Sequence, residues 1–371
     1  MNDPKKLRIA CVIGTRPEAV KMAPVVLALK AQPWADVRVV ATAQHRHMLD
    51  QVLQVFGIAP DVDLDLMQPN QDLTQLTARM LLAMDGVLKD EQPGAVLAQG
   101  DTTTVMVTAL ASFYRNIPFG HVEAGLRTGD MRRPFPEEMN RVLAGHMARW
   151  HFAPTSGSRA NLLREGIADD TIHVTGNTVI DALHTMAART PAAPVTPGRR
   201  LVLVTAHQRE SFGAPFVDIC TAIRTLVDRN EDIEVVYPVH PNPNVKGVVD
   251  EMLAHHPRIS LIAPLDYQPF VAMMKAAHLI LTDSGGVQEE APALGKPVLV
   301  LREETERPEA VEAGVVQLVG TNRERIIEAA QKLLDDEAAY RAMAKGVSPY
   351  GDGHAARRIV DVLQQFHATC G

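Results

Sequence analysis

Residues 95–114 read AVLAQGDTTTVMVTALASFY, and this stretch carries the pattern that decides the fold. A short apolar run at 95–98 has the length of one buried strand, and a turn containing glycine follows it. The longer apolar segment at 103–114 predicts a helix. The same order of strand, loop and helix recurs along the chain. Such alternation is typical of right-handed βαβ units, whose parallel sheet is covered by helices on both faces, so the sequence predicts the α/β fold class.

The pattern occurs twice, which predicts two doubly wound, Rossmann-like domains within the 371 residues. We expect an N-terminal domain over residues 1–171, braced by a C-terminal helix at 356–371, and a C-terminal domain over residues 172–355. Residues 190–200, TPAAPVTPGRR, hold three prolines and no periodic apolar face, which predicts a linker-like segment. Such sheets bind ligands at the carboxyl ends of their strands, so we expect a central cleft that holds the ligand.

Composition and charge exclude several classes of protein. The net charge is −7 and no basic stripe is present, so we expect no nucleic-acid partner. No apolar run approaches the ~18 residues that span a bilayer, so we expect no membrane segment. The three cysteines, Cys11, Cys220 and Cys370, are too scattered for a disulfide framework or a zinc cluster. This spacing indicates a reducing, cytoplasmic location.

Three carboxylates stand at successive junctions between strands and loops. Asp101 follows the strand at 95–98, Glu123 comes directly after the strand at 118–122, and Glu137 opens the next helix. Each has a structural explanation by itself, since Asp101 can cap a helix and Glu137 can complement a helix dipole. Together they form a more specific signal, because catalytic acid and base groups gather at the carboxyl ends of strands.

Two motifs predict anion binding at the start of a helix. In GTRPE, residues 14–18, Arg16 lies at the helix N-terminus with Lys21 nearby, where an anion is stabilised. In TDSGGVQEEAP, residues 282–292, Ser284 and two bare glycine amides can hold a diphosphate, and Glu290 can accept both ribose hydroxyls. The second motif matches neither a Walker A loop nor GxGxxG, so ATP and NAD are not favoured.

A fourth candidate is the pair of histidines that end two strands of the second half. His207 opens the loop HQRESFG after the strand at 201–205, and His240 follows the strand at 233–237. A single histidine is more often structural than catalytic. The position of His207 beside Arg209 at the junction of a loop and a helix favours phosphate contact.

Taken in order, these motifs resemble those of the non-hydrolysing UDP-N-acetylglucosamine 2-epimerases over essentially the whole chain. The resemblance implies a two-domain fold like that of the GT-B glycosyltransferases, a homodimer, and chemistry that uses neither NAD nor a metal. It implies reversible interconversion of UDP-GlcNAc and UDP-ManNAc, by anti elimination of UDP to 2-acetamidoglucal and readdition, in polysaccharide biosynthesis. The segments that carry it are GTRPEAVKMAP, TAQHRHMLDQV, QGDTTT, GHVEAGLRTGD, PEEMNR, TGNTVIDAL, TDSGGVQEEAP, GKPVLVLREETERPEA and SPYGDG.

Residue roles follow from the resemblance, position by position. The catalytic group is Asp101, Glu123, Glu137 and His207. The residues implied to bind the UDP-sugar are Arg16, Lys21, Arg141, Phe270, Ser284, Gly285, Gly286 and Glu290. Some bacterial members bind a second, activating UDP-GlcNAc in a region that matches Gln44, His45, Gln208 and His240. Family members often have arginine where this chain has Gln208, which predicts a weak dependence on the activator.

Several alternatives remain open at this point. A relative acting on a modified UDP-sugar, such as a diacetamido uronic acid nucleotide, would use the same chemistry. A hydrolysing variant would release ManNAc and UDP. A nucleotide-sugar sensor would not need the three carboxylates, and a GT-B glycosyltransferase would need an acceptor groove that the sequence does not identify.

Overall fold

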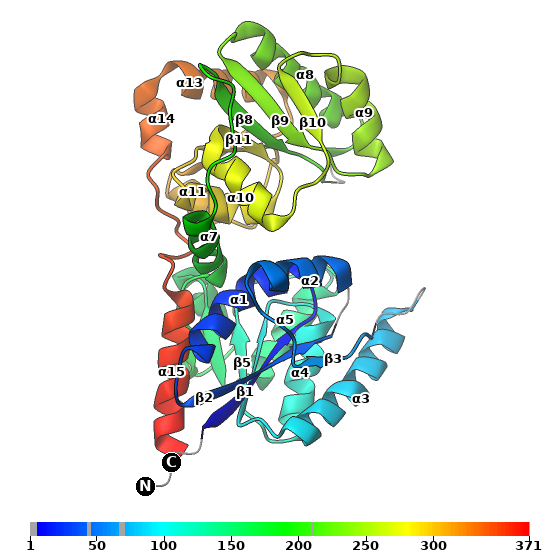
Figure 1. Cartoon of the computed structure of the whole chain (residues 1–371), viewed down its shortest axis with the longest axis vertical. Helices are drawn as coiled ribbons and strands as arrows, with labels where there is room; N and C mark the ends of the chain where they lie inside the picture. Colours follow the sequence, from blue (N-terminus) through cyan, green and yellow to red (C-terminus); the bar gives the residue numbers. More distant parts are fainter. Residues whose placement is uncertain (1–5, 43–45, 67–70, 209–210, 371) are drawn as a thin grey trace. The chain divides into compact units, whose positions relative to one another are not determined.

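The structure, a computed structural model, describes residues 6–42, 46–66, 71–208 and 211–370. It divides into two compact units, the first formed by Met1–Ala182 and Gly351–Gly371 and the second by Leu183–Tyr350 (Figure 1). Each unit contains a parallel sheet with helices packed on it. The predicted α/β class with two Rossmann-like halves is therefore confirmed.

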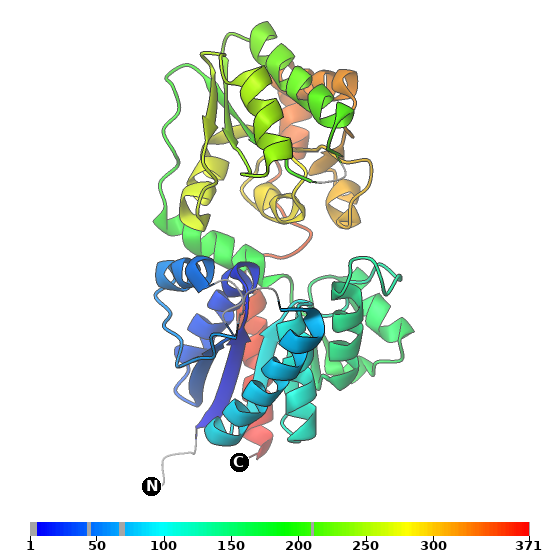
Figure 2. The same ribbon diagram turned by 90° about the vertical axis from the view of Figure 1, so that its right-hand side faces the viewer.

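The sheet of the first unit has the strand order β3-β2-β1-β4-β5-β6-β7. Figures 1 and 2 show α1 and α15 on one face and α3, α4 and α5 on the other. The strands are β1 (Leu7–Ile13), β2 (Ala35–Ala41), β3 (Val62–Asp63), β4 (Ala95–Gln99), β5 (Phe119–Val122), β6 (Trp150–Ala153) and β7 (Ile172–Val174). The helices are α1 (Arg16–Lys30), α2 (Arg46–Val55), α3 (Leu73–Glu91), α4 (Thr103–Tyr114), α5 (Glu137–Met147), α6 (Ser156–Arg164), α7 (Thr178–Arg189) and α15 (Ala355–Cys370).

The central strands are apolar because helices cover both of their faces. Every residue of β4 is buried, and Ala10 and Val12 of β1 pack with Met80 and Met84 of α3 in one core. On the opposite face α15 packs against α1. None of the described helices combines the length and hydropathy needed to cross a bilayer.

The second unit repeats this topology, with the strand order β10-β9-β8-β11-β12-β13. Its strands are β8 (Arg200–Thr205), β9 (Ile233–Pro238), β10 (Ile259–Ile262), β11 (Ala277–Thr282), β12 (Val298–Val300) and β13 (Val316–Leu318). Its helices are α8 (Ala214–Arg229), α9 (Pro243–Leu253), α10 (Tyr267–Ala276), α11 (Gly285–Ala293), α12 (Pro308–Glu312), α13 (Arg323–Asp335) and α14 (Glu337–Met343).

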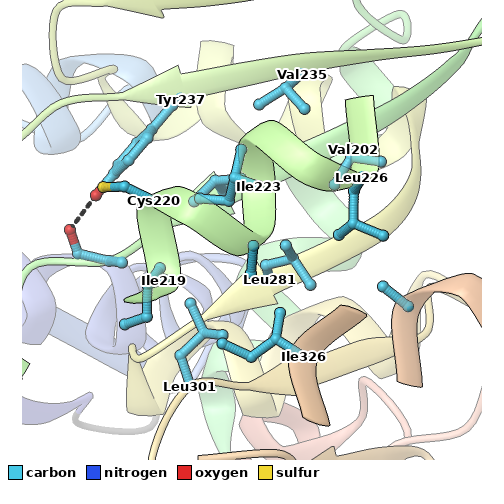
Figure 3. Close-up of a cluster of buried hydrophobic side chains, with 14 of the residues drawn as sticks. Val202, Ile219, Cys220, Ile223, Leu226, Val235, Tyr237, Leu281, Leu301 and Ile326 are labelled. Carbon is cyan, nitrogen blue, oxygen red and sulfur yellow. Dashed lines mark hydrogen bonds between the residues drawn. The ribbon is translucent and has the colours of Figure 1, made fainter. Parts of the chain in front are cut away.

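The core of the second unit lies between its sheet and the helices α8, α9 and α13, and Figure 3 shows the part around α8. Ile223 and Leu226 of α8 pack in one buried cluster with Val202 and Val235 from the strands. Tyr237 is fully buried there and donates its hydroxyl to the carbonyl of Ala206, at 2.6 Å. This hydrogen bond ties the end of β9 to the loop after β8.

The chain passes from the first unit to the second at Ala182, whereas the sequence predicts this boundary at residue 171. β7 pairs with β6, so the first unit extends past residue 171 and ends within α7, at Ala182. Residues 190–200 belong to the second unit, where the Ala193 amide donates to the Ala272 carbonyl and Lys275 Nζ donates to the Thr190 carbonyl. The proline-rich segment is therefore part of the second unit's surface. The chain passes from the first unit to the second within the helix α7.

Candidate active site

Both sheets have a switch point at which the strand order changes direction. In the first unit this point lies between β1 and β4, and in the second between β8 and β11. Doubly wound sheets bind their ligands at the carboxyl ends of such strands. Candidate residues stand at each of these ends: Arg16 follows β1, Asp101 follows β4, His207 follows β8 and Ser284 follows β11.

Glu123 follows β5 and holds a buried carboxylate with several donors around it. The residue is 8% exposed, and its backbone φ of 65° lies in the left-handed region, which is uncommon for a residue with a side chain. Its carboxylate accepts hydrogen bonds from Lys21 Nζ at 2.5 Å, from Asn177 Nδ2 at 2.7 Å and from Gln99 Nε2. Three donors, one of them cationic, favour the ionised form of Glu123.

Asp101 lies in the same electrostatic cluster. Its Oδ2 is 2.5 Å from Nη2 of Arg141. Burial raises the pKa of Asp101, while Arg141 opposes this shift; Glu123 and Glu137 raise the pKa further and Lys21 lowers it. The structure therefore brings together the three carboxylates predicted from the sequence.

Glu137 and Glu138 stand side by side at the start of α5 but have different surroundings. Glu138 is 1% exposed and accepts hydrogen bonds from the amides of Thr128 and Gly129, both at 3.0 Å. Its Oε2 lies 3.3 Å from Nη1 of Arg141. Glu137 is only half-buried. Glu138 therefore anchors the loop that precedes α5, and Glu137 is the carboxylate that remains accessible.

Two cations predicted to bind the substrate are paired with this cluster. Lys21 contacts Glu123, and Arg141 contacts both Asp101 and Glu138. Because each cation is already paired with a carboxylate, Lys21 and Arg141 stabilise the ionised form of the acidic side chains that they contact.

The N-terminus of α1, predicted to bind an external anion, holds a carboxylate of the chain itself. Glu18 is 3% exposed, and its Oε2 accepts from the amides of Gly14 at 2.5 Å and Thr15 at 3.0 Å. Its Oε1 accepts from the hydroxyl of Thr102 at 2.5 Å. Thr15 and Glu18 form a capping box, so these two amides are occupied. Arg16 remains half-buried at the first position of the helix.

The N-terminus of α11 in the second unit has space for an anion. Ser284 is the N-cap residue, and its side chain makes no capping hydrogen bond. A Cβ atom added at Gly285 would meet nothing closer than Nη2 of Arg307, at 3.9 Å, and one at Gly286 would meet Ser284 Oγ at 3.9 Å. Small residues, backbone amides and a nearby guanidinium suit a phosphate group.

Glu290 lies farther along α11 and is held by a buried tyrosine. The side chain of Tyr267 donates its hydroxyl to Glu290 Oε1 at 2.8 Å, and burial raises the pKa of Tyr267 well above its ordinary value. Phe270 is half-buried one turn later in α10. The second oxygen of Glu290 lies 4.0 Å from the position of a Cβ at Gly286, so the carboxylate is close to the helix N-terminus.

The predicted histidines of the second unit stack on each other. The rings of His207 and His240 have centroids 5.3 Å apart and are inclined by 8°. The amides of His207 and Gln208 both donate to Asp283, at 2.6 and 2.7 Å. Gln44 and His45, predicted for the same effector group, lie outside the described residues.

Several residues that hold these groups in place were not predicted from the sequence. Asp283 directly follows a strand, and Asp101 comes two residues after one, so the same signal was sufficient to find Asp283. The other residues come from elements distant along the chain and have no local signature. Those missed are Glu18, Gln99, Asn140, Asn177, Tyr267, Asp283 and Arg307. Asn140 donates from Nδ2 to the backbone carbonyl of Asp101 at 2.9 Å. In the described part of the chain, no group of three or more His, Cys, Asp or Glu side chains is arranged to hold a metal ion.

Similar proteins place this chain in a family. A sequence profile for UDP-N-acetylglucosamine 2-epimerase matches residues 27–364. The UDP-N-acetylglucosamine 2-epimerase of Escherichia coli K12 is 53% identical, covering 96% of this chain and 98% of its own length. The crystal structure of UDP-GlcNAc 2-epimerase from Neisseria meningitidis bound to UDP-GlcNAc is 45% identical, covers 97% of this chain and 100% of its own, and has a TM-score of 0.89. The glycosyltransferase of kitacinnamycin shares the fold, with 12% identity, 98% and 99% coverage and a TM-score of 0.67. The chain therefore belongs to the UDP-N-acetylglucosamine 2-epimerase family.

Proposed function

We propose that the protein is a non-hydrolysing UDP-GlcNAc 2-epimerase that interconverts UDP-GlcNAc and UDP-ManNAc. The observation that carries this proposal is the cluster of Asp101, Glu123 and Glu137 at the carboxyl ends of the first sheet. The relatives described above support it, since one of them was crystallised with UDP-GlcNAc.

The reaction requires a way to make an unreactive hydrogen acidic. The C2 hydrogen of GlcNAc has no adjacent carbonyl, so a side chain cannot remove it directly. As the C1–O bond to UDP breaks, positive charge develops at C1 and acidifies the C2 hydrogen. In UDP-GlcNAc this hydrogen and the diphosphate are both axial and on opposite faces, so anti elimination gives 2-acetamidoglucal and UDP. Readdition of UDP at C1, with a proton delivered to the other face of C2, yields UDP-ManNAc.

Two faces of C2 require more than one acid or base group. Three donors around Glu123 favour its ionised form, whereas burial raises the pKa of Asp101 against the opposing charge of Arg141. Carboxylates with different proton affinities are the arrangement that acid–base exchange needs. Glu137, half-buried at the start of α5, is the third exchanging group.

The second unit supplies the nucleotide contacts in this proposal. Backbone amides at Ser284–Gly286 receive the diphosphate, Glu290 accepts the ribose hydroxyls and Phe270 lies by the uracil. His207 and Arg16 stabilise the charge of the departing UDP, which is the largest electrostatic change of the reaction.

Proton NMR of UDP-GlcNAc incubated with the enzyme in D2O tests the proposal. We expect UDP-ManNAc to appear and deuterium to enter C2 of both nucleotide sugars. Epimerisation that retains the original hydrogen would rule out elimination. Accumulation of free ManNAc and UDP would identify a hydrolysing variant, and no reaction except with a diacetamido uronic acid nucleotide would identify the modified-sugar enzyme.

We also propose that the protein is a homodimer formed through α3 and α4. These neighbouring helices expose large apolar side chains: Leu82 is 77% exposed, Phe113 60% and Tyr114 65%. Clustered apolar surface of this kind favours a protein interface. Light scattering after size-exclusion chromatography should give twice the mass of the chain, and Leu82→Glu should yield monomers. A monomeric unmodified protein would refute this assignment.

A cytoplasmic location and a role in polysaccharide biosynthesis belong to the same proposal. Cys11 and Cys220 are free and buried, as suits a reducing compartment. Fractionation of cells and loss of a ManNAc-containing polysaccharide on deletion of the gene would test these two assignments.

A further inference from the structure

Asp283 is a buried carboxylate to which the proposed mechanism gives no task. It directly follows β11, its side chain is 0% exposed, and its backbone amide donates to the Thr205 carbonyl at 3.0 Å. Its Oδ2 accepts the amides of His207 and Gln208, at 2.6 and 2.7 Å. The side chain thus joins the ends of β8 and β11, the two strands at the switch point of the second sheet.

The other oxygen of Asp283 faces the imidazole of His207. Oδ1 is buried and makes no ordinary hydrogen bond with any described residue, yet it lies 3.4 Å from Nδ1 of His207. The imidazole is fixed from a second direction, because it stacks on His240 with an inclination of 8°. The ring of His207 therefore has a carboxylate oxygen near one edge and the ring of His240 against one face.

From this geometry we infer that Asp283 is a positioning residue for His207, which fixes the imidazole tautomer with the proton on Nδ1. A carboxylate oxygen can only accept, and Oδ1 has no other donor among the described residues, so a proton on the nearby Nδ1 is the arrangement that offers this oxygen a donor. Nε2, at the opposite edge of the ring, is then the nitrogen that can take up a proton, and the imidazolium so formed, stabilised by the charge of Asp283, can face the departing UDP. The inference rests on the proposed function, in which His207 receives the departing UDP.

The charge of Asp283 depends on several neighbours. Burial raises its pKa, while the hydrogen bonds from Gln208 and His207 and the charges of His207 and Arg302 lower it. Burial raises the pKa of the nearby Tyr237, the charges of Cys220 and Asp283 raise it further, and the Tyr237 hydroxyl donates to the Ala206 carbonyl. The donors and cations around Asp283 support the acceptor role that the inference requires.

Replacement of Asp283 by asparagine should reverse the tautomer. The asparagine oxygen would keep the two backbone donors, so its NH2 group would face Nδ1 of His207. That nitrogen would then have to accept, and the ring proton would move to Nε2. The volume of the side chain is almost unchanged, which separates this effect from a change in packing.

The test is NMR of the histidine rings in protein labelled with 15N at histidine, with His207 assigned by the loss of its signals in His207→Gln. In the unmodified protein we expect the neutral ring to carry its proton on Nδ1, and in Asp283→Asn on Nε2. Thr205→Val removes a hydroxyl contact with Thr282 at the same junction and should leave the tautomer unchanged.

A proton on Nε2 in the unmodified protein would overturn the inference even if the Asp283 variant failed to fold. The same tautomer in both proteins would also overturn it. This readout needs no turnover, so it is independent of the proposed reaction.

A double-mutant cycle gives the kinetic test. Since hydrogen bonds to charged groups contribute about 1.5–3 kcal/mol, Asp283→Asn should lower kcat by roughly 10- to 100-fold while the KM for UDP-GlcNAc changes by less than about threefold. In a His207→Gln background the same substitution should have less than about a twofold effect. An equal loss of kcat in both backgrounds would show that Asp283 acts independently of His207 and would refute the inference.

Discussion

Replacement of Glu18 by glutamine should change how the stability of the first unit depends on pH. Burial raises the pKa of Glu18 from 4.5 to about 7, against the opposing effect of the hydrogen bonds from Thr102, Gly14 and Thr15. The folded unit therefore binds this proton more tightly than the unfolded chain does. Stability from the bound proton is fully present below about pH 4.5 and is lost as pH rises toward 7.

The magnitude follows from the difference between the two pKa values. At about 1.4 kcal/mol per pKa unit, the unmodified protein should lose about 3 kcal/mol of unfolding free energy over this range because of Glu18. Glutamine carries no charge, keeps an acceptor for the two backbone amides and cannot titrate. The stability of Glu18→Gln relative to the unmodified protein should therefore rise by about 3 kcal/mol between pH 4.5 and 8.

Urea unfolding followed by tryptophan fluorescence is the appropriate assay. Both tryptophans of the chain, Trp34 and Trp150, lie in the first unit, so their signal reports that unit. Asp90→Asn, at an exposed position of α3, is the matched control and should not reproduce the change. A constant difference between Glu18→Gln and the unmodified protein at pH 5 and pH 8 would refute the reasoning.

Three further predictions concern the site. Glu123→Gln and Glu137→Gln should each lower kcat by ~10²-fold or more, with little change in UDP affinity by calorimetry; a collapse of UDP binding with turnover preserved would assign them to binding instead. Tyr267→Phe removes the hydrogen bond to Glu290 and should weaken the binding of UDP by about 3- to 10-fold. The affinity for 2′-deoxy-UDP should differ less between the two proteins. An equal loss of affinity for both ligands would contradict a role of Glu290 in binding the ribose. Because Gln208 has no charge, the unmodified enzyme should convert UDP-ManNAc alone without a marked lag, and Gln208→Arg should restore the lag and tighten effector binding; a strict requirement for added UDP-GlcNAc in the unmodified enzyme would contradict this.

Much of the fold could be predicted because the relevant signals are local. The helix predicted at 103–114 coincides with α4 (Thr103–Tyr114), since its limits depend on adjacent residues and on the turn before it. The helix α3 (Leu73–Glu91) was not predicted, although its buried residues Leu76, Met80 and Met84 recur at helical spacing. The first unit ends at Ala182 and not at the expected residue 171, because α7 (Thr178–Arg189) runs without a break across the boundary and no turn marks it in the sequence.

The sequence by itself determined that the chain forms parallel sheets and that acidic and small residues stand at the ends of their strands. Strand, turn and helix signals depend on a few neighbouring residues, so they can be read along the chain. Only the tertiary structure decided which side chains meet there. Glu123 contacts Lys21 and Asn177, which are 102 and 54 positions away, and Asp283 contacts His207 across 76 positions. These contacts depend on strand order, which places β4 beside β1 and β11 beside β8, and crossovers bring those strands together without leaving a trace in local composition.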